Sequence, residues 1–398
     1  MTKDEKFSLI HSVFSPTAPV EQRDLFYGRL DQFKKLAGAI TERGQHAILY
    51  GDRGVGKTSL SNIAAVIFGE VTVSKVTCNR TEDFRSIWDK AFQKIRFSKD
   101  TGIGFRAASQ KVSDQLNLFL PDVDNLASNH IESVLEHLNT KLLFIFDEFD
   151  SIKDPEIKMR MADTIKALSD NVKNVTVLIV GIANDVNDLI GEHPSLERCL
   201  LQIHMPLMSN GELSQIIDNG LKKLNLTIST EVKNKIIEYS SGYPSYTHLL
   251  CKYASIEAID QDANEITTQH FTTAVKESIE NTTQSLRNDY QAATITSKGA
   301  TQFDNVLFAC ALAPMDEFNC FSAKEMTSEY NKITGKNSKS SSLRYHIDTL
   351  CSADKGSILE KIGVTQNVKY KFRNPMMKAF VRLKIHESNR IKKMQKPQ

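Results

Sequence analysis

The sequence has 398 residues, which is too long for one compact hydrophobic core and suggests two or three domains. Its 40% hydrophobic and 25% charged residues are ordinary for a globular protein, and no apolar run approaches the roughly 20 residues of a membrane span. The opening MTKDEKFSLI lacks the apolar core of a signal peptide. A cytoplasmic location with no membrane partner is therefore expected.

The charge is unevenly distributed. The net charge is +2, but residues 331–398 carry 16 Lys and Arg against 4 Asp and Glu, or +12. The remaining residues, 34 basic against 44 acidic, carry −10. The basic C-terminal segment predicts a polyanionic partner. The six cysteines are scattered without a C-x-x-C pair, which argues against zinc or disulfides and favours buried thiols.

Residues 1–208 alternate between helical and strand patterns. Apolar positions recur at helical spacing over 30–40, and helices are also expected after residue 56 and over 82–95. Short apolar runs predict strands over 46–50, 71–78, 141–150, 174–185 and 201–209. This order predicts an α/β fold with a parallel sheet and crossover helices. Residues 98–125 interrupt the rhythm and suggest an inserted hairpin or loop.

The rest of the chain has a different pattern. Residues 209–290 are helical throughout, and the small polar stretch 291–300 is a linker candidate. Residues 301–385 give three helices followed by two strands, which is the order of a winged helix, a variant of the helix-turn-helix. The basic tail 386–398 is expected to be disordered.

The stretch GDRGVGKTS, residues 51–59, contains a G-x-x-x-x-G-K-T motif between a predicted buried strand and a helix. Its glycines let backbone N–H groups turn toward phosphate oxygens, and the positive end of the helix dipole adds to this attraction. The motif predicts ATP and Mg²⁺, with Lys57 on the phosphates and Thr58 on the metal. The expected nucleotide contacts are Gly51, Asp52, Arg53, Gly54, Val55, Gly56, Lys57, Thr58 and Ser59.

The run FIFDEFD, residues 144–150, is a buried strand that ends in acids. Asp147 is expected to hold Mg²⁺ through water, and Glu148 to act as general base toward the attacking water. Any buried strand can end in acids. Together with the glycine loop, however, the pair indicates an ATPase.

Residues 25–63, LFYGRLDQF…GQHAILYGDRGVGKTSLSNI, resemble the AAA+ and STAND NTPases, and more specifically bacterial relatives of the origin-recognition and cell-division-control ATPases. The resemblance implies a P-loop AAA+ core, a helical lid and a C-terminal winged helix. It also implies that Asn184 senses the γ-phosphate. Arg198 would complete the nucleotide site of a neighbouring subunit in a homo-oligomer. Asn184 could equally be a helix N-cap, and Arg198 a solvated helix-end arginine.

The lid departs from that pattern. Replicative relatives carry an arginine shortly after a lid glycine, whereas this chain reads SSGYPSYTHLL, residues 240–250. The G-x-P form, with Pro244 as a candidate nucleotide contact, resembles the STAND signalling branch and favours slow hydrolysis. His248 could face nucleotide, although a lone helical histidine is more often an ordinary surface or core residue. Tyr27 is a candidate for the adenine pocket, unless the first helix simply docks on the core.

In a winged helix the third helix enters the major groove and the hairpin touches phosphates, so salt-sensitive contact with duplex DNA is expected. The candidate DNA contacts are Lys339, Arg344, Tyr345, Lys369, Lys371 and Arg373. Two functions remain open. In one, nucleotide controls assembly and DNA binding. In the other, a nucleotide-gated switch acts on a protein effector, as in antiphage defence or transposition, and its winged helix docks protein. A metabolic kinase would leave the lid and winged helix unexplained.

Overall fold

The structure, a computed structural model, describes residues 1–20, 24, 26–100, 111–123, 125–183, 185–191, 194–295, 302–316, 318–363 and 368–394. Residues 19–52 and 56–205 form one compact unit, called here the sheet unit. Residues 1–18 and 206–398 belong to a second, the helical unit. Within the described ranges, no helix is both long enough and apolar enough to cross a membrane.

The sheet unit is built on a parallel five-stranded sheet in the order β2-β5-β6-β1-β7, which confirms the predicted α/β fold. The interior strand β5, between β2 and β6, is buried along its whole length, as expected of a parallel strand covered on both faces. The strand expected over 201–209 ends earlier, at His204. The strands are β1 (His46–Gly51), β2 (Thr72–Thr77), β5 (Leu142–Asp147), β6 (Val175–Ile182) and β7 (Leu200–His204).

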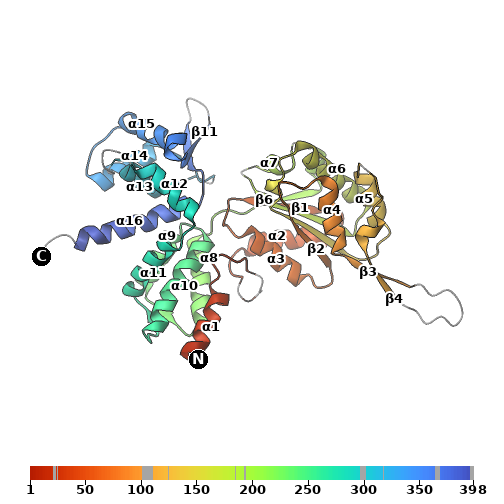
Figure 1. Cartoon of the computed structure of the whole chain (residues 1–398), viewed down its shortest axis with the longest axis horizontal. Helices are drawn as coiled ribbons and strands as arrows, with labels where there is room; N and C mark the ends of the chain where they lie inside the picture. The colour runs from red at the N-terminus through yellow and green to blue at the C-terminus, as the bar shows by residue number, and fades with distance from the viewer. Residues whose placement is uncertain are drawn as a thin grey trace. The chain divides into compact units, whose positions relative to one another are not determined.

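Helices cover both faces of this sheet, because right-handed crossovers change face when the strand order reverses (Figure 1). One face carries α2 (Leu30–Thr41) and α3 (Lys57–Ile67); the other carries α4 (Phe84–Gln93), α5 (Ser128–Leu135), α6 (Pro155–Asn171) and α7 (Asn187–Ile190). The core between α4 and β5 is aromatic. Trp88 meets Phe144 and Phe146 edge-on, with ring centroids 5.4 and 5.1 Å apart.

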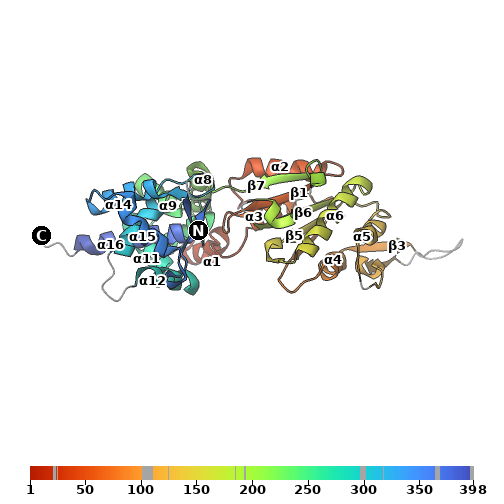
Figure 2. The same cartoon turned by 90° about the horizontal axis from the view of Figure 1, so that it is seen from above.

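The predicted insertion contains a hairpin. Strand β3 (Arg96–Asp100) pairs antiparallel with β4 (Lys111–Gln115), and the 3₁₀ turn η2 (Leu116–Phe119) follows. The two strands leave the body of the sheet unit as an arm (Figures 1 and 2). Residues 101–110 and 124 of the predicted insertion lie outside the described residues. Two further 3₁₀ turns, η3 (Phe149–Ser151) and η4 (Pro194–Leu196), complete this unit.

The helical unit contains the predicted lid helices and also the N-terminus. Helix α1 (Lys3–Val13) packs against α10. Phe14 is fully buried, and its ring comes so close to Gly220 that a Cβ there would lie 2.5 Å away. Residues 1–18 were expected to belong to the core 1–208. They belong instead to the helical unit, where apolar side chains anchor them. The other elements are α8 (Asn210–Lys223), β8 (Thr227–Ile228), α9 (Thr230–Ser240), α10 (Pro244–Asp260), β9 (Glu265–Ile266), α11 (Thr268–Glu280) and α12 (Gln284–Thr294).

The last part of the helical unit has the expected helices and strands, with one short strand more. Its strands form an antiparallel sheet in the order β10-β12-β11. The elements are α13 (Gln302–Leu312), β10 (Phe321–Ser322), α14 (Ala323–Thr334), α15 (Ser340–Leu350), η5 (Ala353–Lys355), β11 (Leu359–Ile362), β12 (Lys369–Phe372) and α16 (Met377–Met394).

Two segments that were expected to be irregular are helical in part. Of the linker candidate 291–300, residues up to Thr294 belong to α12, and residues 296–300 lie outside the described residues. Helix α16 continues to Met394, so most of the tail expected to be disordered is ordered. Tertiary contacts hold α16. Arg382 donates to the carbonyl oxygens of Glu238 and Ala311, both at 3.0 Å, and these lie on α9 and α13.

Candidate nucleotide and metal site

The glycine loop joins the carboxyl end of β1 to the amino end of α3, as the motif predicts. Gly51 has φ 145°, and a Cβ there would lie 2.5 Å from the carbonyl oxygen of Met205, so no side chain fits. Gly56 precedes α3 with φ 98°. Asp52, Arg53, Gly54 and Val55 form the intervening loop. Helix N-terminal N–H groups lack intrahelical partners, so this end suits an anion.

Lys57 is buried within the loop. Its ammonium donates to the carbonyl oxygens of Gly51 at 2.9 Å and Asp52 at 2.8 Å. The charge therefore sits where the loop and the first turn of α3 meet. Ser59, on the same turn, accepts a hydrogen bond from the backbone N–H of Val20 at 3.0 Å.

Asp147 ends β5 and is only 4% exposed. Its Oδ1 lies 3.5 Å from the Thr58 hydroxyl and accepts from the N–H of Glu148 at 2.9 Å. Its Oδ2 forms an ion pair with Lys75 at 2.9 Å. The backbone is fixed too, since its carbonyl oxygen accepts from the N–H of Cys78 at 2.8 Å.

The donor set fits Mg²⁺. A hydroxyl and a carboxylate meet at the start of α3, and Mg²⁺ commonly takes one or two such protein oxygens and fills its octahedron with water and phosphate oxygens. In the described part of the chain, no group of three or more His, Cys, Asp and Glu side chains could hold a metal alone.

Glu148 follows Asp147 in a left-handed conformation, with φ 55°. This conformation is unfavourable for residues with a Cβ and often marks functional sites. The side chain is exposed, although the strand that precedes it is buried. One turn later, the carboxylate of Asp150 accepts from the N–H of Ile182 at 2.9 Å, which ties η3 to the end of β6.

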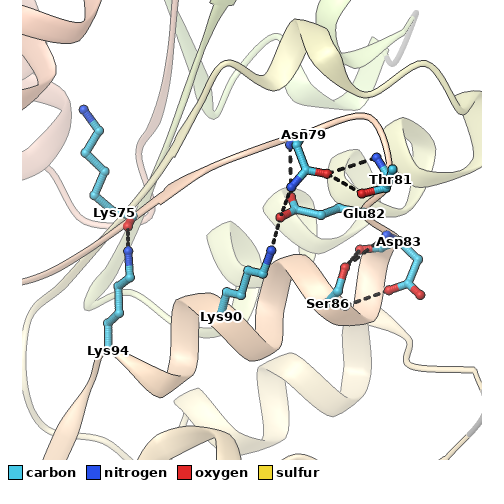
Figure 3. A network of polar contacts seen from close by, with 8 residues as sticks. All are labelled: Lys75, Asn79, Thr81, Glu82, Asp83, Ser86, Lys90 and Lys94. Carbon is cyan, nitrogen blue, oxygen red and sulfur yellow. Dashed lines mark hydrogen bonds and ion pairs between the residues drawn. The ribbon is translucent and has the colours of Figure 1, made fainter.

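A polar network fixes the segment that follows β2 (Figure 3). Glu82 accepts from the Asn79 side chain at 3.0 Å and pairs with Lys90 of α4. Asn79 in turn accepts from the N–H of Thr81 at 3.0 Å. Neither this network nor the role of Lys75 was predicted from the sequence. The local signal for Lys75 is a lysine in a strand of mostly β-branched residues.

The novel STAND NTPase 1 family profile matches residues 18–298, which is more than two thirds of the chain. The chain belongs to this family. Its sheet, P-loop and acidic strand end are those of a P-loop NTPase of the STAND and AAA+ type. No curated protein matches the sequence.

Several solved structures are similar to the chain at low sequence identity. The chain is similar to the Walker-type ATPase of Pyrococcus abyssi, with a TM-score of 0.53 and 15% identity over 93% of this chain and 99% of that one. It is also similar to the ORC2 protein of Aeropyrum pernix, described with ADPNP and ADP, with a TM-score of 0.49 and 15% identity over 95% and 98%. The ORC1 protein of the same organism, in complex with DNA, gives 0.46 and 13% over 96% and 98%.

In this STAND NTPase, Arg198 lies where the parallel strands begin, whereas the P-loop lies where they end. The next residue, Cys199, accepts from the N–H of His46, where β1 begins, whereas the P-loop follows the end of β1. Arg198 is 73% exposed and pairs with Asp170 at 2.8 Å. Asn184, the candidate phosphate sensor, lies outside the described residues. Tyr27 donates its hydroxyl to the carbonyl oxygen of Asp24, and its adenine contact stays a prediction.

The G-Y-P segment of the lid forms the turn between α9 and α10. Gly242 has φ 84°, and a Cβ there would lie 2.7 Å from that of Leu207. Pro244 is buried as the first residue of α10. His248 is a core residue of the helical unit. Its ring meets Phe14 edge-on at 5.9 Å, and burial lowers its pKa to about 4.

The candidate DNA contacts divide by exposure. Lys371 is only 6% exposed and lines a small pocket with Tyr243 and Lys378. It therefore does not lie on an outer face, as was expected of a DNA contact. Strand alternation puts it on the same face as the exposed Lys369, but residues of other segments, among them Leu207 and Tyr243, cover it. Lys369 is exposed and pairs with Asp316 at 2.7 Å. The other exposed members of the set are Lys339, Arg344, Tyr345 and Arg373.

Proposed function

We propose that the protein is a slow ATPase whose nucleotide state controls its assembly and its binding to duplex DNA. One observation carries the proposal. The ammonium of Lys57, the hydroxyl of Thr58 and the carboxylate of Asp147 converge at the carboxyl edge of one sheet, with Glu148 next to them. That edge is where open α/β sheets bind ligands.

Each of these residues has a defined task in ATP hydrolysis. The loop N–H groups and Lys57 would bind the phosphates, and Thr58 and Asp147 would hold Mg²⁺. The metal, when bound, neutralises charge on the phosphates. Glu148 would accept a proton from the attacking water, and Lys57 would stabilise the charge that moves toward the leaving ADP.

Two features support slow turnover and assembly. The lid carries Gly242 and Pro244 where an arginine would assist the reaction, so less transition-state charge is neutralised. Arg198 is separated from its own P-loop by the length of a strand, about 16 Å for five residues. It could stabilise transition-state charge only in a neighbouring subunit. Each subunit of the active oligomer would then supply Arg198 to the nucleotide site of the next.

For the C-terminal part, we propose a winged helix with α15 as the recognition helix. The order of three helices and an antiparallel hairpin supports this assignment. Arg344 and Tyr345 project from the exposed face of α15, with Tyr345 72% exposed, while Leu343 and Ile347 are buried. The excess of 12 positive charges in residues 331–398 supports contact with phosphates.

The test is the specific ATPase rate as a function of protein concentration, with and without duplex DNA. We expect the rate to rise with concentration and with DNA in the wild type. Glu148→Gln and Arg198→Ala should reduce hydrolysis strongly, whereas the control Arg160→Ala, which removes an arginine paired with Glu156 on α6, should not. If the rate does not depend on protein concentration, on DNA or on Arg198, the proposal fails and a monomeric nucleotide switch is the remaining function.

A second candidate function is a switch that acts on a protein partner. The contacts of α16 favour it. Arg382 joins α9 of the lid to α13, and His386 packs against Tyr239 at 5.2 Å between ring centroids. A lid movement would therefore carry residues 302–394 with it, whatever they bind. Absence of duplex binding at low salt, together with retained ATP binding, would favour this function over the first.

A further inference from the structure

A lysine that the phosphate-binding motif does not include lies against the metal-binding carboxylate. Lys75 is in β2, an edge strand, yet its side chain is only 25% exposed. Its ammonium lies 2.9 Å from Asp147 Oδ2 and donates to Asn62 Oδ1 at 2.6 Å and Ser61 Oγ at 3.3 Å. It thus bridges α3 and the end of β5.

The strand register places Lys75 there. In the parallel pairing of β2 with β5, Lys75 is opposite Ile145 and Thr77 is opposite Asp147, so alternate residues share one face. Ser74, of opposite parity, donates to the carbonyl oxygen of Ala91 on α4. Lys75 therefore faces α3. Figure 3 shows its side chain leaving β2 on the side away from Lys94, which donates to its backbone carbonyl.

The electrostatic consequence concerns the nucleotide. A nearly buried carboxylate beside a triphosphate site repels the phosphates, and a low local dielectric strengthens the repulsion. Lys75 cancels much of that charge before any metal arrives. The carboxylate still has its Oδ1 on the side of Thr58.

We infer that Lys75 is the resident counter-ion of Asp147, and that it lowers the dependence of ATP binding on Mg²⁺. The inference rests on the proposed function, because it assumes that ATP binds at this loop. By linkage, the factor by which Mg²⁺ tightens ATP binding equals the factor by which ATP tightens Mg²⁺ binding. Removing the charge of Lys75 should raise that coupling factor, since the metal alone would then neutralise Asp147.

The experiment measures ATP dissociation constants in EDTA and in saturating Mg²⁺, using a fluorescent ATP analogue. For Lys75→Met, we expect the ratio of the two constants to rise about tenfold over the wild type, mainly through weaker binding in EDTA. Lys75→Gln, which keeps hydrogen-bonding capacity but no charge, should give a similar rise. Lys75→Arg should restore the wild-type ratio. Lys90→Met, which removes a lysine paired with Glu82, is the matched control and should leave the ratio unchanged.

The outcomes separate the two proposals. If the wild type binds no ATP in Mg²⁺, the proposed function fails. If ATP binds but Lys75→Met and Lys75→Gln keep the wild-type ratio, the counter-ion inference is overturned and Lys75 is only a structural bridge. Folding is checked by the emission of Trp88, the single tryptophan, which is buried against β5. If Lys75→Met does not fold, Lys75→Gln and Lys75→Arg still decide between charge and hydrogen bonding.

Discussion

The hydroxyl of Thr58 lies 3.5 Å from Oδ1 of Asp147, although 89 positions separate the two residues in the sequence. The strand order brings them together. Only β6 lies between β1, which leads into the P-loop, and β5, which ends at Asp147. Parallel strands end at the same edge, so a hydroxyl from a helix start and a carboxylate from a strand end can share one metal.

Replacing Lys57 with alanine should abolish stabilisation by ATP. The ammonium is held inside the loop, where its full positive charge can attract the phosphates. At an ATP concentration 100 times its dissociation constant, the wild type should gain about 2.7 kcal/mol of stability. Thermal unfolding with and without ATP and Mg²⁺ measures this gain. The control Lys35→Ala, on the exposed side of α2, should keep it, and retention of the gain by Lys57→Ala would place ATP elsewhere.

Glu148→Gln should separate binding from hydrolysis. Glutamine fits the same left-handed backbone and exposed position but cannot accept the water proton. The rate should fall by about 10²–10⁴-fold, while the ATP dissociation constant stays within about twofold. Phosphate release and nucleotide titration report the two quantities. An unchanged rate would mean that another group is the base.

Stability should fall in mild acid because of two buried histidines. Burial lowers the pKa of His46 and of His248 to about 4, so both stay neutral in the folded protein. Between about pH 6.5 and pH 4 the unfolded chain binds protons that the folded chain does not, and stability is lost as the pH falls through that window. Each histidine contributes at most about 3 kcal/mol.

Urea unfolding across that pH range tests this pH dependence. His248→Phe should flatten the profile of the helical unit. His137→Gln, which replaces an exposed histidine, should leave the profile unchanged. A profile of the wild type that is flat from pH 7 to pH 4.5 would contradict the prediction.

Phe14→Ala should destabilise the helical unit by about 3–5 kcal/mol, because a fully buried ring leaves a cavity between α1, α8 and α10. The matched control is Phe318→Ala in the same unit. Its ring is mostly exposed, and its loss should change stability by less than about 0.5 kcal/mol. Urea midpoints measure both variants. Equal effects would show that α1 does not anchor this unit.

Removing Arg344 should lower the salt dependence of duplex binding. Each phosphate contact contributes about one to the slope of log affinity against log salt, so Arg344→Ala should reduce that slope by about one. Lys371→Ala should lower the melting temperature but leave the slope intact, because Lys371 is buried. If Lys371 changed the slope and Arg344 did not, the hairpin would have to open on DNA.

The sequence by itself determined the features that depend on neighbouring residues. The spacing from Gly51 to Thr58 sets a backbone shape over eight residues, and the short apolar run before Asp147 indicates a buried strand. Both predictions needed no knowledge of distant contacts. The same local logic located the inserted hairpin and the change to helices after Ser209.

Only the tertiary structure decided which distant side chains meet. Lys75 reaches Asp147 because β2 pairs with β5 in one register, and a slip of one residue would turn it to the other face. Lys371 is buried and α1 joins the helical unit because other elements cover them. The charge and hydrophobicity of each side chain follow from the sequence. Its exposure and its ion-pair partners depend on how the helices and strands pack.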